Sequence, residues 1–187
     1  MGARLARSTG VEDAIAAPAF DAPSEAEAEF EALYRSSRDD VYAYAAGLLR
    51  DRAAAEDVTA LAFERAYRKR RRYNPRRGSR RAWLFGIARN AALDELRRRG
   101  WSAELVGEAA DDAPGSDERA EVALRRAALR QAMARLSARE RELVALKFFG
   151  GLSNAEIGRV IGVSESNAGT RLHRVVEKLR RECDEAE

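Results

Sequence analysis

The sequence contains one cysteine and one histidine, and this scarcity excludes several kinds of protein. Cys183 has no second cysteine to pair with, so an intramolecular disulfide and a cysteine-based zinc site are ruled out. A Ser-His-Asp site would have to be built around His173, and there is no glycine-rich phosphate-binding loop. We therefore expect a protein that is not an enzyme and that uses no metal or cofactor.

Long apolar runs and alternating strand patterns are also missing. No apolar run approaches the roughly 20 residues that span a bilayer. The N-terminal residues include Glu12 and Asp13 and lack the apolar core of a signal peptide. We accordingly expect a cytoplasmic protein without membrane insertion. Because Gly and Pro are sparse within the periodic segments while Ala and Arg are abundant, the composition favours helices, and we predict an all-α fold.

The charge is present in blocks that alternate in sign. The net charge is −4 over residues 1–29, +9 over 30–100, −5 over 101–120, +6 over 121–182 and −3 over 183–187. Blocks of this kind usually separate folded units from tails and linkers. Two basic units indicate a polyanionic partner such as a nucleic acid.

These blocks, together with the helical periodicity, predict two small helical domains joined by a flexible acidic linker. The boundaries that we predict are a disordered N-terminal tail over 1–24, a first domain over 25–100, a linker over 101–120, a second domain over 121–182 and an acidic tail over 183–187.

Residues 152–174 carry the pattern of a helix-turn-helix. Ile157 and Ile161 form the inner face of a first short helix, Gly162 supplies the turn, and Ser164 can cap a second helix. In this architecture the exposed side chains of the second helix enter the major groove. The alternative is a plain helical hairpin with a solvated polar face. The side chains expected to face DNA are Glu165, Ser166, Asn167, Thr170, Arg171, His173 and Arg174.

Residues 68–81 hold nine basic residues and no acidic one. Tyr73 lies among them, and Trp83 and Phe85 follow. Cations bind the phosphate backbone and aromatic rings stack on unpaired bases, so this mixture suits partly melted DNA. The alternatives are a solvated basic helix end and a Trp83 that belongs to the core. The amphipathic segment 55–67 is equally compatible with a packed helix and with a partner-binding helix.

Together these segments resemble an extracytoplasmic-function (ECF) sigma factor of the sigma-70 family, over about residues 28–182. Segment 55–67 is similar to the family's core-polymerase-binding helix, although the usual Gln is Ala60 here. The resemblance implies binding to the β′ and β subunits of core RNA polymerase. The residues that it assigns to this contact are Glu56, Asp57, Phe63 and Tyr67.

Residues 81–99 are similar to the most typical sequence of that family, and residues 121–182 resemble its −35-binding region. The resemblance implies that the first segment and its preceding loop recognise and open the −10 promoter element. Ser166, Ala168 and Gly169 depart from the common recognition-helix start, so no promoter preference is carried over. An anti-sigma partner is also implied. The −10 residues implied are Tyr73, Arg76, Arg77, Arg80, Arg81, Trp83, Arg89 and Asn90.

Two further alternatives stay open at this stage. The acidic linker either mimics nucleic-acid charge or only keeps the chain soluble; its reach of about 65 Å is close to two turns of B-DNA at about 34–36 Å each.

Residues 136–142 and 151–157 also resemble a LuxR-type DNA-binding domain. The N-terminal half argues against that family, because it has no βα receiver pattern and carries the basic helix instead.

Overall fold

The computed structural model describes residues 24–99 and 117–184, and every regular element within them is helical. The predicted all-α fold is therefore confirmed. Residues 1–23 of the tail predicted over 1–24, residues 101–116 of the linker predicted over 101–120, and residues 185–187 of the tail predicted over 183–187 lie outside the described residues. Residues 183 and 184 continue the last helix. The elements are α1 (Glu25–Leu49), α2 (Arg52–Lys69), η1 (Arg70–Arg72), η2 (Pro75–Arg77), α3 (Arg80–Arg98), α4 (Asp117–Ala134), α5 (Ala138–Phe148), α6 (Asn154–Ile161) and α7 (Glu165–Asp184).

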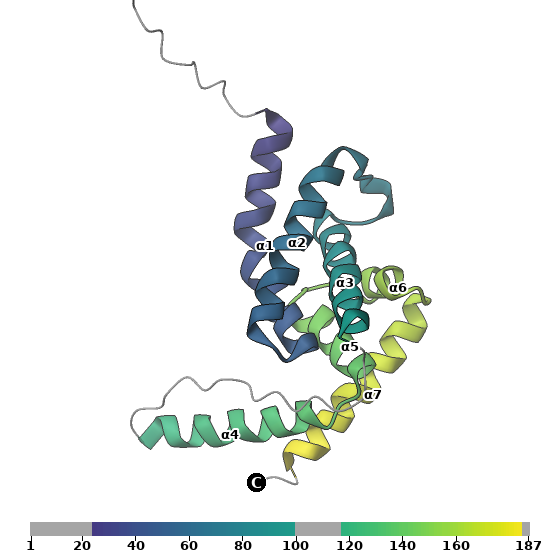
Figure 1. Cartoon of the computed structure of the whole chain (residues 1–187). Coiled ribbons are helices and arrows are strands. Elements are labelled where there is room, and N and C mark those ends of the chain that lie inside the picture. The colour runs from purple at the N-terminus through teal and green to yellow at the C-terminus, as the bar shows by residue number, and fades with distance from the viewer. Residues whose placement is uncertain (1–23, 100–116, 185–187) are drawn as a thin grey trace, which may run out of the picture.

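Helices α1, α2 and α3 pack side by side and form an N-terminal unit (Figure 1). Helix α1 ends where Arg50 adopts a left-handed conformation, and the Asp51 carboxylate then accepts a hydrogen bond from the Ala54 N–H to start α2. The Ser79 hydroxyl accepts from the Ala82 N–H in the same way at the start of α3. The turn at Arg50 and the caps at Asp51 and Ser79 fix where each helix ends and the next begins, and the three helices then pack through their apolar faces.

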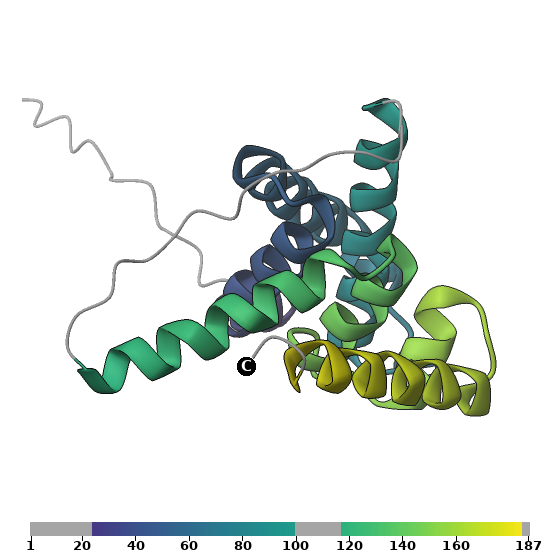
Figure 2. The ribbon, with the colours of Figure 1, turned by 90° about the horizontal axis from the view of Figure 1, so that it is seen from below.

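Helices α4 to α7 form a C-terminal unit in which α4 lies against the end of α7 and projects from the body (Figures 1 and 2). Helix α4 begins at Asp117, so the residues from 117 to 120 are helical. Its apolar face is buried only toward the C-terminal end, where Leu136 follows it at 2% exposure. Val122 and Leu129, apolar residues nearer its N-terminal end, are 44% and 48% exposed.

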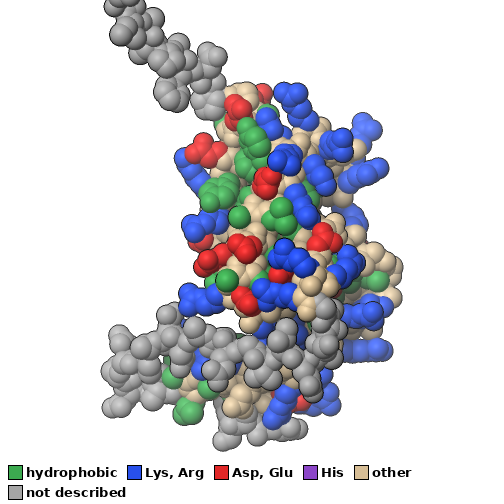
Figure 3. Space-filling view, in the orientation of Figure 1, with side chains coloured by type: hydrophobic (Ala, Val, Ile, Leu, Met, Phe, Trp, Pro, Cys, Tyr) green, Lys and Arg blue, Asp and Glu red, His purple; other side chains and the backbone are tan. Residues whose placement is uncertain are grey.

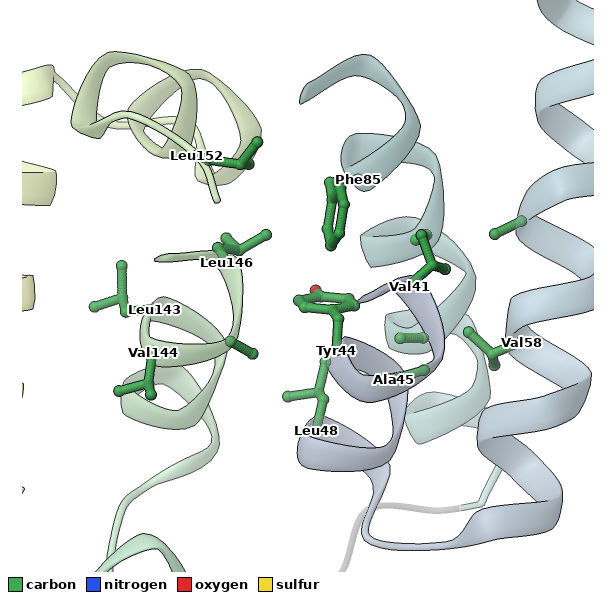
Figure 4. Packing of buried hydrophobic residues seen from close by; sticks show 14 of the residues in the cluster. Val41, Tyr44, Ala45, Leu48, Val58, Phe85, Leu143, Val144, Leu146 and Leu152 are labelled. Atoms are coloured by element: carbon green, nitrogen blue, oxygen red, sulfur yellow. The ribbon is translucent and has the colours of Figure 1, made fainter. Parts of the chain in front are cut away.

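The two units are packed against each other, which the sequence did not predict. Helix α5 lies on α1, and α6 lies on α3. Figure 4 shows Tyr44 and Leu48 of α1 and Phe85 of α3 on one side of this contact, with Leu146 of α5 and Leu152 on the other. All five side chains are almost completely buried, so one hydrophobic core runs through both units.

Candidate nucleic-acid and partner interfaces

The loop between α2 and α3 is held in shape by its own polar groups. The Asn74 side chain accepts a hydrogen bond from the Arg76 N–H and starts η2. The Tyr73 hydroxyl donates to the Gly78 carbonyl at 3.1 Å. Gly78 has a φ of +136°, a conformation that favours glycine. The loop therefore presents its arginines from a defined backbone.

Tyr73 and Trp83 form an aromatic pair at the base of this loop, with ring centroids 5.7 Å apart. Both side chains are half-buried, so Trp83 is neither a full core residue nor a fully exposed ring. The Arg80 guanidinium lies 4.7 Å from the Tyr73 ring and pairs with Glu29 at 2.8 Å. Figure 3 shows Lys and Arg side chains gathered over this end and side of the molecule. Cations and partly open rings thus share one surface.

Two other predicted −10 residues contact the C-terminal unit. Arg81 pairs with Asp40 at 2.6 Å and also donates to the Phe149 carbonyl at 2.9 Å. Arg89 pairs with Glu142 of α5 at 2.5 Å. Asn90 beside it is exposed, as are Arg76 and Arg77 in the loop. The sequence carried no signal for these partners, because they lie more than 40 residues away in the chain.

An aromatic cluster lies on the outer face of α1 and α2. Phe63 makes edge contacts with Phe30 and Tyr34, at centroid distances of 6.4 and 4.8 Å. Tyr67 packs on Phe30 and remains 40% exposed, whereas Phe63 is only 6% exposed. Sequence reasoning missed Phe30 and Tyr34 as part of this surface, although their spacing of four residues along α1 could have indicated it.

Glu56 and Asp57, the acidic residues predicted to contact polymerase, are both exposed near the start of α2. Tyr67 lies in the last turns of the same helix. The structure therefore places these three predicted residues along α2 and available to a partner, while Phe63 is buried beneath the surface.

The helix-turn-helix is built around two glycines. Gly162 has a φ of +80° and makes the turn. A Cβ atom on Gly158 would lie 2.7 Å from the Val163 carbonyl oxygen, so only glycine allows the turn to approach α6 this closely. Ser164 then accepts a hydrogen bond from the Asn167 N–H at 3.3 Å and caps α7.

Every residue predicted to face DNA from α7 is exposed in the structure. Gly169, a weak helix former, has a packing reason to be there. A Cβ atom at this position would lie 3.1 Å from the Asn154 amide nitrogen at the start of α6. The adjacent Ala168 is 1% exposed and contributes to the core. These two small residues thus allow α6 and α7 to pack closely together.

Electrostatic contacts continue along the boundary between the two units. Burial raises the pKa of the Glu156 carboxyl, but hydrogen bonds from Ser79 and Ser153 outweigh this effect and lower the pKa overall. Burial, with Glu142 nearby, raises the pKa of Tyr44.

A cavity of about 600 Å³ opens between α3, α5 and α7. Arginines at its wall include Arg89, Arg171 and Arg174.

Two family models match this chain: Sigma-70 region 2 over residues 33–102, and Sigma-70 region 4 over residues 126–179. The chain is 34% identical over 154 residues to the ECF RNA polymerase sigma factor SigL of Mycobacterium tuberculosis, a match covering 80% of this chain and 85% of that protein. The chain belongs to the ECF class of the sigma-70 family. The family resemblance is confirmed, and this RNA polymerase sigma factor is not a LuxR-type regulator.

Other relatives agree with this assignment. The sigma factor is 35% identical over 161 residues to CarQ of Myxococcus xanthus, covering 84% of this chain and 91% of that protein. Its fold matches the sigma factor RpoE of Bartonella quintana, solved with the anti-sigma factor NepR, at a TM-score of 0.67 and 22% identity, covering 83% and 97% of the two chains. CnrH, solved with the cytosolic domain of CnrY, matches at a TM-score of 0.59 and 25% identity, covering 84% and 89%.

Within residues 24–99 and 117–184, no helix is long and apolar enough to cross a membrane. In the same part of the sigma factor, no group of three His, Cys, Asp or Glu side chains is arranged to hold a metal ion.

Proposed function

We propose that this sigma factor binds core RNA polymerase and divides promoter recognition between its two units. The unit over 25–100 binds polymerase and opens the −10 element, and the unit over 121–182 reads the −35 element. The observation that carries this proposal is the half-buried Tyr73–Trp83 pair beneath the cations of the α2–α3 loop. Rings that keep one face accessible can stack on an unpaired base while neighbouring arginines hold the backbone.

The residues that we assign to the −10 element differ in their present availability. Arg76, Arg77 and Asn90 are exposed and can meet DNA directly. Arg80 is tied to Glu29. Arg81 and Arg89 are bound to protein acceptors and must exchange them for phosphate oxygens. Tyr73 and Trp83 complete the set as stacking surfaces.

The polymerase contact is assigned to the outer surface of α2. Glu56, Asp57 and Tyr67 are exposed there. Tyr67 offers an aromatic side chain of the kind enriched at protein interfaces, and the two carboxylates suit a basic surface of a partner. Phe63 supports Tyr67 through the Phe30 ring that they share, and so positions the contact without forming it.

The −35 contact is assigned to the exposed face of α7. Ser166, Asn167 and Thr170 can read base edges, while Arg171 and Arg174 bind phosphates. Glu165 and His173 flank them on the same exposed surface.

The remaining parts of the proposal follow from the family. RpoE and CnrH were solved with anti-sigma factors or their domains, and we propose that this chain also binds an anti-sigma factor.

The sigma factor acts in the cytoplasm as an initiation factor rather than as a catalyst. The acidic linker contributes either nucleic-acid mimicry or solubility.

The deciding experiment combines the purified sigma factor, core RNA polymerase and a pool of promoter fragments. We expect transcripts that start at defined promoters only when the sigma factor is present. Sequencing the recovered DNA would identify both promoter elements at once. Binding to duplex DNA with no change in polymerase activity would contradict the proposal.

A second experiment tests the division of labour within the N-terminal unit. Replacing Arg76, Arg77 and Arg80 with Ala should impair promoter opening, followed by permanganate reactivity, more than polymerase binding. The matched control removes the same charge from exposed arginines elsewhere: Arg38, Arg180 and Arg181. Equal losses of opening and polymerase binding in the loop variant would refute the assignment.

A further inference from the structure

We propose that the cavity between α3, α5 and α7 binds a small amphiphilic anion, a molecule that joins an alkyl chain to a phosphate head group. The volume of the cavity, about 600 Å³, lies within the range of about 300–1,000 Å³ that is usual for small-molecule sites. Binding of this ligand is independent of the proposed function. Its effect on DNA rests on the −35 role proposed for Arg171 and Arg174.

One part of the cavity lining is aliphatic and only partly covered by protein. Three of its large aliphatic side chains are buried and three are half-buried. The buried ones are Leu48, Leu143 and Val175, and the half-buried ones are Leu93, Leu96 and Ile161. An alkyl chain that lies against the half-buried side chains removes apolar surface from water, which favours binding.

The charged part of the lining is mainly cationic, with five arginines and two glutamates. Both glutamates already have cationic partners. Glu142 pairs with Arg89 at 2.5 Å, and Glu140 pairs with Lys178 at 3.2 Å. The carboxylates of the lining are therefore neutralised without the help of its other arginines.

Three arginines of the lining remain available to an anion. Arg139, Arg171 and Arg174 are exposed, and none of them has an ion pair or hydrogen bond within the described part of the chain. A guanidinium presents several N–H groups in a planar arrangement that matches the oxygens of a phosphate. These three side chains can thus hold a phosphate head group beside the aliphatic surface.

The combination of aliphatic and cationic side chains favours an alkyl phosphate over a nucleotide or duplex DNA. Among the described residues that line the cavity, none is aromatic, so a nucleobase would find no ring on which to stack. The backbone of duplex DNA carries phosphates but no alkyl chain that could cover Leu93, Leu96 and Ile161. A single amphiphile satisfies both parts of the lining.

Occupation of the cavity affects −35 binding through Arg171 and Arg174. The N–H groups that hold the head group of the ligand are the ones that would bind a DNA phosphate, so the two anions compete for them. By linkage, the ligand weakens duplex binding by the same factor as the duplex weakens ligand binding. An amphiphilic anion therefore lowers the affinity of the sigma factor for −35 DNA.

Titration calorimetry on the full chain tests the ligand class directly. The probes are octyl phosphate, hexyl phosphate, octanol and inorganic phosphate. Octyl phosphate should bind at one site per chain and about fifteen-fold more tightly than hexyl phosphate, because each buried methylene contributes about four-fold in affinity. Octanol and inorganic phosphate, which each lack one half of the ligand, should bind at least about ten-fold more weakly than octyl phosphate.

Two variants test the two parts of the lining. Arg139→Ala should weaken the binding of octyl phosphate by about ten-fold, because it removes a charged hydrogen-bond donor. Leu93→Ala should reduce the gain in affinity from hexyl to octyl phosphate. The matched controls are Arg181→Ala and Leu124→Ala, which change exposed residues outside the cavity lining and should leave the affinity unchanged. Circular dichroism checks that each variant folds, and if Leu93→Ala does not, Arg139→Ala decides.

Fluorescence anisotropy with labelled duplex −35 DNA tests the competition. Octyl phosphate should raise the Kd of the parent for this DNA, and inorganic phosphate at the same concentration should not. In Arg139→Ala, the same concentration of octyl phosphate should raise the Kd less, because less of the ligand is bound.

Three results would overturn the inference: binding of octyl phosphate at many weak sites or at none, equal affinity for octanol or inorganic phosphate, or an unchanged affinity in Arg139→Ala. Binding of phosphatidic-acid vesicles, or of an acidic amphipathic peptide helix, in place of octyl phosphate would also overturn it. Failure of the −35 assignment is distinguishable, because the parent would then not bind duplex promoter DNA even without octyl phosphate, while calorimetry would still measure binding to the cavity.

Discussion

Three of the arginines assigned to the −10 element are held by protein partners, whereas the two assigned to phosphates of the −35 element are not. In the N-terminal unit, Arg80, Arg81 and Arg89 are held by carboxylates or carbonyls. In the C-terminal unit, Arg171 and Arg174 are exposed and have no ion pair or hydrogen bond within the described part of the chain. The first set must exchange partners before it meets DNA, whereas the second needs no rearrangement. A high local density of arginine therefore does not by itself give an available DNA surface.

The largest expected effect comes from removing the packing that joins the units. Leu146 has no exposed surface and faces α1 from α5. Leu146→Ala should lower the free energy of unfolding by about 2–5 kcal/mol, because it removes buried methyl groups and leaves a cavity. Urea denaturation followed by circular dichroism measures this change. Leu124→Ala, at a residue that is 72% exposed, is the control and should change little.

The same variant tests whether the units are coupled. A single cooperative transition in the parent should separate into two in Leu146→Ala, with Arg89 released from Glu142. Two independent unfolding transitions in the parent would show that the packing of α5 on the N-terminal unit does not couple the two units. The difference in availability between the −10 and −35 arginines would then not depend on that packing.

The next prediction separates the two DNA surfaces. Gly158→Val should destabilise the helix-turn-helix by about 1–3 kcal/mol, because its side chain would meet the Val163 carbonyl. Binding to duplex −35 DNA should weaken, while binding of single-stranded DNA by the N-terminal unit should not, as gel-shift titrations with both probes would show. Gly86→Ala is the matched control, since a Cβ atom there meets nothing within 4 Å. Equal loss of duplex and single-stranded DNA binding would contradict the proposal that the two units bind these two forms of DNA separately.

A smaller effect is expected at the open arginines. Arg171→Ala or Arg174→Ala should lower the salt dependence of duplex binding by about one unit of slope for each phosphate that is no longer neutralised. Titrations at several salt concentrations measure this slope. A slope equal to that of the parent would mean that the side chain does not touch phosphate, and that its exposure serves another purpose.

The smallest effect concerns pH and the cap of α5. Burial raises the pKa of Glu140, but hydrogen bonds from Ser137 and the pairing with Lys178 outweigh it and bring the pKa below its ordinary value of 4.5. Its contribution to stability is therefore complete above that value and is lost as the pH falls through the lowered pKa. The stability difference between the parent and Glu140→Gln, from denaturation at pH 7 and in acid, should shrink toward low pH. A difference that grows in acid would contradict the assigned sign.

Much of the secondary structure could be predicted because its signals are local. Ser79, Ser137 and Ser153 cap helices through bonds to amides three residues away, and Gly162 turns the chain by its own φ. The exposed face of α7 followed from the same periodicity. The roles of the exposed residues stay predictions, since exposure shows availability and not contact.

Less of the tertiary arrangement could be predicted, because apolar periodicity marks which face is buried but not what buries it. Tyr44 and Leu146 were compatible with cores of separate domains, yet in the structure they share one. Periodicity likewise marks Val122 and Leu129 as apolar positions of α4. Both stay partly exposed, since no neighbour within the described residues covers the first half of the helix's apolar face.

The sequence by itself determined the helical fold, the positions of the caps and turns, and the family, because each depends on residues close together in the chain. Only the tertiary structure decided which arginines are open to DNA. Arg81 and Arg89 find acceptors in α5 and the residues that follow it, and charge pairing across such a separation depends on the packing of whole helices.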